Sequence, residues 1–294
     1  MKTRIIVAAV LLPVFFAVLF IFPPIVLTLV IMAICAIAAY ELLAATKIIN
    51  KRVIVYTIIA AVLTPMAVYL SFVLHMATRS NYSLLTLITL LLSIFFIFIS
   101  WLVIEFVLTF KTKKPEVSAK RLKLKQIPIT IAAGMLIPFL LSSLISLKCL
   151  EYGHLLVLLP IIAAFTTDSG AYFVGVTMGK TKAFPKISPN KTIEGCVGGV
   201  ITGTLGILLY GIIISYATPL TVLYPALFLY GVLGSVVTQL GDLTFSLIKR
   251  KCGIKDYGKI MPGHGGALDR FDSMTFAAPT MLLLVVLIPA IIFV

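Results

Sequence analysis

Charged residues are scarce in this sequence: they make up 12% of its 294 residues, whereas hydrophobic residues make up 61%. The mean hydropathy of +1.17 is too high for a soluble globular protein. Apolar runs of about 20 residues, the length that crosses a bilayer as a helix, recur along the whole chain. The composition therefore predicts a polytopic integral membrane protein of the all-α class.

Cysteine and histidine are also rare, which excludes two kinds of site. The four cysteines are scattered, and no two of them have Cys-x-x-Cys spacing: Cys35, Cys149, Cys196 and Cys252. Neither a zinc site nor a disulfide framework is predicted from this spacing. Without clustered histidine or cysteine ligands, a metal in this protein would be bound by oxygen atoms.

Apolar runs long enough to cross a bilayer are expected at nine places. In chain order they lie near 5–22, 25–45, 53–73, 83–110, 127–147, 154–176, 195–215, 219–248 and 273–293. Pro23-Pro24 and Thr218-Pro219 lie at tight joints between neighbouring runs and mark turns there, because proline favours turns. No small-residue cleavage pattern follows the first run, so we interpret it as a transmembrane helix and not as a signal peptide.

Acidic residues are few: there are ten, against 24 basic residues, which gives a net charge of +14. When the nine spans are in place, every basic residue except Arg79 and Lys148 falls on one side of the membrane. Loops rich in Lys and Arg stay in the cytoplasm. The N-terminus and the charged loops are therefore expected in the cytoplasm and the C-terminus outside. The positive charge is explained without a nucleic-acid partner.

The acidic residues divide the chain into two parts. Residues 1–150 hold three of them, Glu41, Glu105 and Glu116, and no dense polar motif, so we expect N-terminal transmembrane scaffold helices there. Residues 151–294 hold the other seven. We predict that this second part is a catalytic transmembrane domain with a polar cavity that faces the cytoplasm.

Asp168 lies inside an apolar span, twelve residues before the basic loop that starts at Lys180. At the rise of an α-helix this places it about 18 Å from the membrane edge. An ionisable group at that depth is costly unless it faces a wet cavity or a cation. A protonated or hydrogen-bonded structural residue is the alternative, and we favour a functional carboxylate.

The loop that follows is rich in lysine. Residues 179–195 hold four lysines, together with Ser188 and an expected helix start at Thr192. Ammonium groups and helix N-terminal amides both stabilise anions, so this loop is a candidate receptor for phosphate. Glycines at 195, 199 and 203 then recur every fourth residue, which predicts close approach of another helix.

The last polar stretch lies just before the final apolar run. Asp269 and Asp272 are three residues apart and leave the same face if a helix begins here. Asp242 lies seven residues before Lys249, at a depth where Asp168 can approach it. Carboxylates this close repel one another unless a divalent cation neutralises them, and an oxygen-only ligand set suits Mg²⁺ better than zinc.

Acids for a metal and basic residues for phosphates, gathered at the cytoplasmic side of a membrane protein, fit phosphoryl or nucleotidyl transfer to a lipid. His264 lies between Gly263 and Gly265, where the chain can turn sharply. Contact of His264 with a ligand and a purely local role both remain open.

These polar residues resemble the C-terminal signature of the phosphatidate cytidylyltransferases, or CDP-diacylglycerol synthases. The matching positions are Ser246, Ile248, Lys249-Arg250, Lys255-Asp256, Gly258, Met261, Pro262, His264-Gly265-Gly266, Asp269-Arg270, Phe271 and Asp272. Further matches are Asp168-Ser169-Gly170-Ala171-Tyr172, Ser188-Pro189, Lys191-Thr192, Glu194-Gly195 and Gly241-Asp242-Leu243. Ala267 is smaller than the apolar residue usual at its position. The likeness spans roughly residues 160–275.

The resemblance implies that CTP reacts with phosphatidate to give CDP-diacylglycerol and pyrophosphate for phospholipid synthesis, with Mg²⁺ and with K⁺ as a second ion. It implies a metal centre of Asp242, Asp269 and Asp272, with Asp168 as a fourth contributor. It also implies phosphate contacts from Lys191, Lys249, Arg250, Lys255 and Arg270, and substrate positioning by Ser188, Thr192 and His264. Among these residues, the catalytic set comprises Asp242, Asp269, Asp272, Lys249 and Arg270.

We expect such an enzyme in a bacterial cytoplasmic membrane, with its active site facing the cytoplasm. Its partners would be CTP, phosphatidate and the surrounding lipid, with no nucleic acid. The sequence leaves a monomer and a homodimer open.

Two other functions remain as alternatives. A CTP-dependent lipid kinase of the polyprenol type would share the membrane and the nucleotide, but its substrate hydroxyl would attack the γ-phosphorus. A membrane transporter would also place carboxylates inside the bilayer. The chain shows no paired half-repeats, however, and its polar residues crowd one end of the spans instead of the midplane.

Overall fold

A computed structural model describes residues 13, 15–78, 83–111, 122–258, 260 and 265–293. The chain forms two compact units, and each is made of two separate segments. Unit 1 comprises Met1–Cys149 and Ile254–Arg270, and unit 2 comprises Leu150–Gly253 and Phe271–Val294. This division does not assign a role to either unit, so the predicted scaffold and catalytic parts stay predictions.

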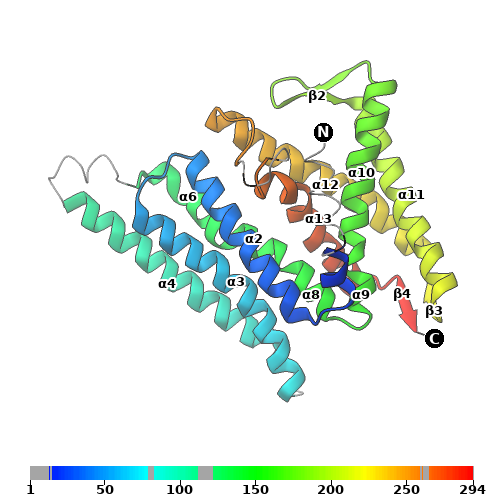
Figure 1. The fold of residues 1–294 in the computed structure, drawn as a ribbon, viewed down its shortest axis with the longest axis horizontal. Coiled ribbons are helices and arrows are strands. Elements are labelled where there is room, and N and C mark those ends of the chain that lie inside the picture. The colour runs from blue at the N-terminus through cyan, green and yellow to red at the C-terminus, as the bar shows by residue number, and fades with distance from the viewer. Residues whose placement is uncertain are drawn as a thin grey trace. The chain divides into compact units, whose positions relative to one another are not determined.

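Unit 1 is built from long apolar helices that pack side by side. Pro24 starts α2 directly after Pro23, where a proline fits because the first amides of a helix have no intrahelical partner. Helix α3 packs between α2 and α4 (Figure 1). The helices are α2 (Pro24–Ala45), α3 (Lys51–Thr78) and α4 (Ser83–Lys111).

The last span of unit 1 is irregular. Pro128 and Pro138 interrupt its hydrogen-bond ladder, because proline has no amide proton to donate. Between them, Ala132–Leu136 has π-helical geometry, which absorbs the interruption. The pieces are η1 (Leu124–Gln126), α6 (Ile127–Ile131), η2 (Ala132–Leu136), α7 (Ile137–Leu141) and α8 (Ser143–Cys149). Together they are still long and apolar enough to cross a membrane once.

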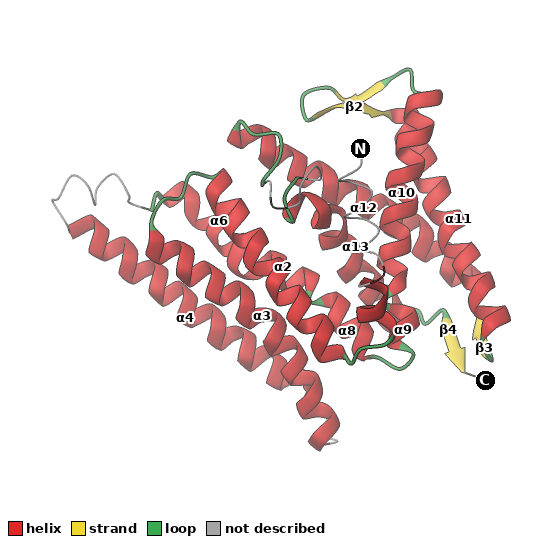
Figure 2. Cartoon of the chain, viewed as in Figure 1, coloured by secondary structure: helices red, strands yellow, loops and turns green. Residues whose placement is uncertain are grey.

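Unit 2 holds a second group of helices and two small pairs of strands (Figure 2). In chain order its elements are α9 (Gly153–Leu156), α10 (Leu158–Thr177), β1 (Lys182–Phe184), β2 (Ser188–Thr192), α11 (Ile193–Ala217), β3 (Leu220–Val222), α12 (Tyr224–Cys252), α13 (Leu268–Leu287) and β4 (Ile291–Phe293). Helix α13 begins in the segment that belongs to unit 1 and continues in unit 2 from Phe271.

The glycines of α11 lie against neighbouring helices, as the four-residue repeat predicts. A Cβ atom at Gly195 would lie 2.7 Å from the carbonyl oxygen of Ala171, and one at Gly199 would lie 3.0 Å from that of Thr167. A Cβ at Gly203 would overlap the hydroxyl of Ser235 on α12. Small residues therefore let α10, α11 and α12 pack backbone to backbone, and the predicted close approach is confirmed.

The strands are a departure from the purely helical prediction. The lysine loop forms a hairpin in which Lys182 pairs with Thr192 and Phe184 with Ser188. At the other end of unit 2, β3 pairs with β4 (Figure 1). The last predicted span, 273–293, therefore differs at both ends: α13 begins at Leu268 and ends at Leu287, and the chain goes on as β4.

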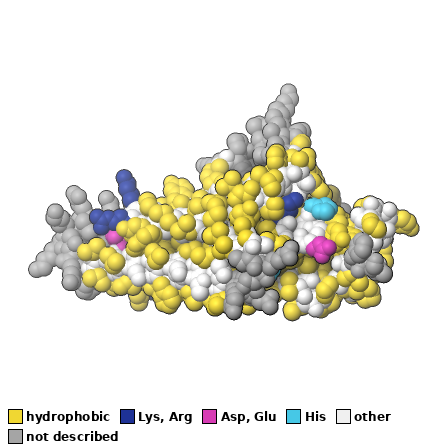
Figure 3. Space-filling model, turned by 90° about the horizontal axis from the view of Figure 1, so that it is seen from below, with side chains coloured by type: hydrophobic (Ala, Val, Ile, Leu, Met, Phe, Trp, Pro, Cys, Tyr) yellow, Lys and Arg dark blue, Asp and Glu magenta, His cyan; other side chains and the backbone are white. Residues whose placement is uncertain are grey.

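Eight helical segments in the described part of the chain are long and apolar enough to cross a membrane. They correspond to the last eight of the nine expected spans. The first expected span, 5–22, lies mostly outside the described residues, so the count of nine and the sides of the two termini stay predictions. Hydrophobic side chains cover most of the surface seen in Figure 3, as an integral membrane protein requires.

Candidate active site

Three carboxylates interact in unit 2, each from a different helix. Asp168 lies on α10, Asp242 on α12 and Asp272 on α13. Each of them is close enough to the other two for their negative charges to repel one another. Ser273 lies beside this group, and its Oγ atom donates a hydrogen bond to Oδ2 of Asp168 at 3.1 Å.

Lys191 provides the first counter-charge. It lies in β2, and its Nζ atom is 2.5 Å from Oδ2 of Asp242. Both side chains are about a quarter exposed or less, so water screens this ion pair only partly. The pair joins the lysine hairpin to the middle of α12.

Lys249 provides the second counter-charge, near the C-terminal end of α12. Its Nζ atom lies 3.9 Å from Oδ2 of Asp272, and both residues are buried. The backbone amide of Ser273 also donates to Oδ1 of Asp272, at 2.8 Å. Gly241 makes room for this arrangement, because a Cβ there would lie 2.9 Å from the carbonyl oxygen of Asp272.

The charges of this cluster do not balance. Lys191 and Lys249 oppose three carboxylates, so the cluster keeps one excess negative charge when all five groups are ionised. Within the described ranges, no three acidic, histidine or cysteine side chains already converge around one point as metal ligands. By charge and by their oxygen donors, the three carboxylates nevertheless fit a divalent cation such as Mg²⁺.

The hairpin is held in place by hydrogen bonds from both of its neighbours. The side chain of Thr192 accepts a hydrogen bond from the amide of Gly195 at 3.1 Å and so caps α11, which confirms the predicted helix start. Glu194 accepts from the amide of Thr181 at 3.2 Å. Nε of Arg250 donates to the carbonyl oxygen of Ile187 at 3.1 Å.

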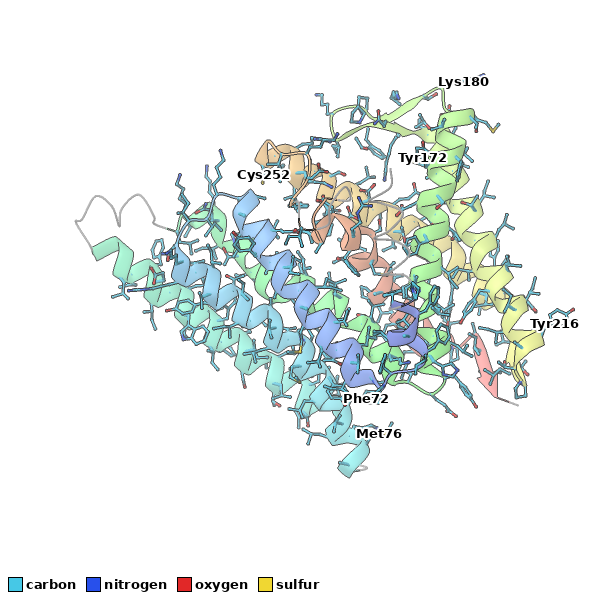
Figure 4. All side chains as sticks on the ribbon, viewed as in Figure 1. Phe72, Met76, Tyr172, Lys180, Tyr216 and Cys252 are labelled. Carbon is cyan, nitrogen blue, oxygen red and sulfur yellow. The ribbon has the colours of Figure 1, made fainter. Side chains whose placement is uncertain are left out.

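Two residues predicted to contact substrate thus have structural partners in the hairpin region. Arg250 bonds the hairpin and Thr192 caps the following helix, while Ser188 begins β2. Their predicted roles toward substrate stay predictions. In Figure 4, Lys180 lies at the hairpin end of unit 2 and Tyr216 at the opposite end.

Asp269 is the second residue of α13, directly after the loop that precedes this helix. Its Oδ2 atom accepts hydrogen bonds from the amides of Tyr257 at 2.8 Å and Gly266 at 3.1 Å, so it closes this loop on itself. Arg270 and Lys255 are exposed residues of the same segment. His264 lies outside the described residues.

Two residues of interest were not predicted from the sequence. Ser273 carries no signal beyond its place next to Asp272. Glu41 is also a carboxylate inside an apolar span, although it lies closer to the end of its span than Asp168 does, and an ionisable group there is costly without partners. It is buried, and its side chain accepts hydrogen bonds from two backbone amides.

Comparison with known proteins bears on this arrangement. A model described as the Cytidylyltransferase family matches residues 2–288. The chain belongs to this family. The resemblance found in the sequence is thereby confirmed at the level of the family, and the match extends beyond residues 160–275 to almost the whole chain.

Individual members of the cytidylyltransferase family are similar over a shorter stretch. The phosphatidate cytidylyltransferase of Bacillus subtilis is 44% identical over 137 residues, which are 47% of this chain and 49% of that protein. The phosphatidate cytidylyltransferase of Staphylococcus saprophyticus is 43% identical over 130 residues, 44% of this chain and 48% of that protein. An uncharacterized Escherichia coli protein, YnbB, is also 43% identical over 130 residues, 44% of this chain and 42% of that protein. The matched part spans about half the length of these relatives.

Proposed function

We propose that this member of the cytidylyltransferase family transfers the cytidylyl group of CTP to phosphatidate and produces CDP-diacylglycerol and pyrophosphate. The observation that carries the proposal is the cluster of Asp168, Asp242 and Asp272 with Lys191 and Lys249 inside a membrane-spanning unit. The names of the Bacillus and Staphylococcus relatives support phosphatidate as the acceptor.

The proposed reaction is a substitution at phosphorus. An oxygen of the phosphatidate phosphate attacks the α-phosphorus of CTP, the new P–O bond forms, and the bond to the β-phosphate oxygen breaks to release pyrophosphate. The attacking phosphate is already ionised near neutral pH, so no strong general base is needed. The protein has to align two anionic reactants and to screen their repulsion.

The lysines of the cluster suit this screening. Lys191 and Lys249 form ion pairs with carboxylates of the cluster. Their ammonium groups could therefore also neutralise the charge of phosphates that bind beside the cluster. Asp168, Asp242 and Asp272 would hold Mg²⁺, which supplies positive charge against the negative charge of the reacting phosphates when bound. The remaining predicted contributors are Asp269 for the metal, Arg250, Lys255 and Arg270 for phosphates, and Ser188, Thr192 and His264 for substrate position.

The location of the cluster fits a lipid substrate. CTP is soluble in water and phosphatidate lies in the bilayer, so the site must be open to both. The lysine hairpin at one end of unit 2 is expected to face the cytoplasm, because positively charged loops stay there. We propose a bacterial cytoplasmic membrane as the location, with K⁺ as the expected second ion.

The test uses purified protein in detergent with phosphatidate, Mg²⁺ and CTP labelled at the α-phosphorus in one arm and at the γ-phosphorus in the other. Label from the α-position in the lipid fraction supports cytidylyl transfer. Lipid labelled only from the γ-position would indicate a kinase instead. If both labels stay in soluble nucleotides and pyrophosphate, the proposed function is wrong.

A further inference from the structure

Glu41 is a carboxylate buried in the membrane-spanning part of unit 1. It lies on α2, and only 2% of the residue is exposed. An ionisable side chain in such a place is costly unless other groups satisfy it. Its hydrogen-bond partners therefore indicate why it is there.

Those partners are backbone amides at the start of α13. The amide of Ala267 donates to Oε1 of Glu41 at 3.1 Å, and the amide of Leu268 donates to Oε2 at 2.9 Å. Leu268 is the first residue of α13. The first amides of a helix have no acceptor within the helix, and a negative charge near them is stabilising. Glu41 supplies both the acceptor and the charge.

Two glycines make room for this carboxylate. A Cβ at Gly266 would lie 2.5 Å from Oε1 and 2.6 Å from Oε2 of Glu41, and a Cβ at Gly258 would lie 2.7 Å from its Cδ. The positive-φ glycines of the described chain are Gly253 and Gly265. The backbone at 258 and 266 is therefore not in the left-handed region, and it is the carboxylate of Glu41 that leaves no space there for a side chain.

The same loop is fixed at a second point by Asp269, which accepts from the amides of Tyr257 and Gly266. Glu41 and Asp269 together bind four backbone amides of the segment 257–268. Helix α13 carries Asp269 and Asp272 in its first five residues. A displacement of its first turn would displace both.

We propose that Glu41 is a positioning residue for the cytidylyl-transfer site: it fixes the start of α13 and thereby the carboxylates that the helix carries. This inference rests on the proposed function. Glu41 acts through backbone amides and need not contact either substrate. A part of the chain that the sequence indicates to be scaffold would then set the geometry of the acidic residues.

Glu105 offers a matched control. It is also a buried glutamate of unit 1, on α4, and 4% of it is exposed. It accepts a hydrogen bond from Nδ2 of Asn50 at 2.7 Å and pairs with Arg52 at 3.6 Å. Replacement of Glu105 therefore disturbs unit 1 through contacts with α3 and its N-terminal flank, without removing an acceptor from the amides at the start of α13.

The first experiment compares Glu41→Gln and Glu105→Gln in steady-state cytidylyl transfer. Gln keeps the size of Glu but loses the charge and one acceptor. We expect Glu41→Gln to lower kcat by about 100-fold with KM for CTP changed by less than about threefold, because small misplacements of catalytic groups cost rate more than binding. Glu105→Gln is expected to stay near wild type. Normal kcat in Glu41→Gln would overturn the proposal.

A second experiment measures the stability of the loop before α13 without any assay of turnover. Hydrogen exchange of the Ala267 and Leu268 amides in detergent is expected to be about tenfold faster in Glu41→Gln, the effect of one lost charge-assisted hydrogen bond. Unchanged exchange would show that Glu41 does not hold these amides. If the wild-type protein transfers no cytidylyl group, the proposed function fails, while this exchange result still decides whether Glu41 fixes the loop.

A third variant covers the case in which Glu41→Gln does not fold. Gly266→Ala adds a methyl group where the carboxylate of Glu41 lies, so it is expected to slow turnover in the wild-type background. In a Glu41→Ala background the same methyl group meets no carboxylate, and its effect should be much smaller. Additive effects of the two changes would contradict the proposal, because independent sites add and coupled ones do not.

Discussion

At the scale of single residues, we expect substitution of Asp242 to lower the rate of cytidylyl transfer strongly. It faces Lys191 across 2.5 Å and shares its surroundings with Asp168 and Asp272. Asp242→Asn keeps the shape of the side chain and removes its charge. We expect kcat of cytidylyl transfer to fall by about 100-fold or more, since charge stabilisation is the largest part of such catalysis.

The control for this variant is Thr244→Ala on the same helix, whose hydroxyl donates to the carbonyl of Leu240 within α12. It should retain turnover. Both proteins are compared by transfer of α-labelled CTP into lipid. Equal activity of Asp242→Asn and Thr244→Ala would remove Asp242 from the site.

Asp269 is expected to behave differently, because it also has structural partners. Asp269→Asn should abolish turnover, as the family resemblance implies. It should also weaken the hydrogen bonds to Tyr257 and Gly266, at a cost of about 1–3 kcal/mol in the free energy of unfolding. The protein is expected to stay folded in detergent with a lower Tm. Turnover near that of wild type would exclude Asp269 from the metal centre.

At the scale of elements, the hairpin of β1 and β2 depends on Arg250. The bond from Arg250 to Ile187 joins α12 to the tip of the hairpin. We expect Arg250→Ala to raise KM for CTP by about fivefold to tenfold, because the hairpin would lose the hydrogen bond that fixes it to α12. A hydrogen bond from a charged group contributes about 1.5–3 kcal/mol, and the other contacts of the hairpin would compensate for part of this loss. Limited proteolysis near residues 184–188 should become faster.

The neighbouring exposed cation Lys251 provides the control, since Lys251→Ala removes the same charge from the same end of α12. If Lys251→Ala raises KM for CTP as much as Arg250→Ala, the effect is one of general charge and not of the hairpin contact.

The packing of α11 gives a prediction about stability. At Gly203 a larger side chain would overlap Ser235 and Thr167, both of which are fully buried. Gly203→Val is therefore expected to destabilise unit 2 by about 3 kcal/mol or more, as overpacking of a tight core does. The measurement is the fraction of monodisperse protein on size-exclusion chromatography after heating in detergent. Leu205→Val, at an exposed position two residues later, should leave this fraction unchanged.

At the scale of the whole molecule, the orientation in the membrane is the main prediction. Lys180 and Tyr216 lie at opposite ends of unit 2 (Figure 4), and Tyr216 is 88% exposed. In a background without the four native cysteines, Lys180→Cys should react with a membrane-impermeant maleimide only in inverted vesicles. Tyr216→Cys should react only in vesicles of native orientation. The reverse pattern would place the lysine hairpin outside the cell and contradict the positive-inside assignment.

Much of the helical frame was predictable from the sequence, because an apolar run as long as a bilayer is thick is rarely anything but a membrane-spanning helix. Thr192 as a helix start and the glycines at 195, 199 and 203 follow from local rules, and the structure has them. The hairpin was not predictable. Lys182 pairs with Thr192 through backbone groups, and the strands of the hairpin show no alternation of apolar and polar side chains.

The candidate site was accessible from the sequence only in part. Carboxylates in apolar spans are costly, and this rule selects Asp168 and Asp242. The partners of each carboxylate depend on side-chain directions that no spacing encodes, as with Lys191 and Lys249. The same rule covers Glu41, but its role could not be predicted because its partners are backbone amides, which leave no mark in the sequence.

The carboxylate of Glu41 is synthesised long before the amides that bind it, since Ala267 follows it by 226 residues. At a ribosome that adds about 5–20 residues per second, α2 waits about 10–45 seconds in the membrane before its partner exists. During that interval the carboxylate of Glu41 lacks the two amides that satisfy it in the finished chain, and an ionisable group without partners is costly in a membrane-spanning helix. A chain that ends before residue 267 never gains these amides. We therefore expect such a truncated chain to be degraded faster in the cell than the full-length chain.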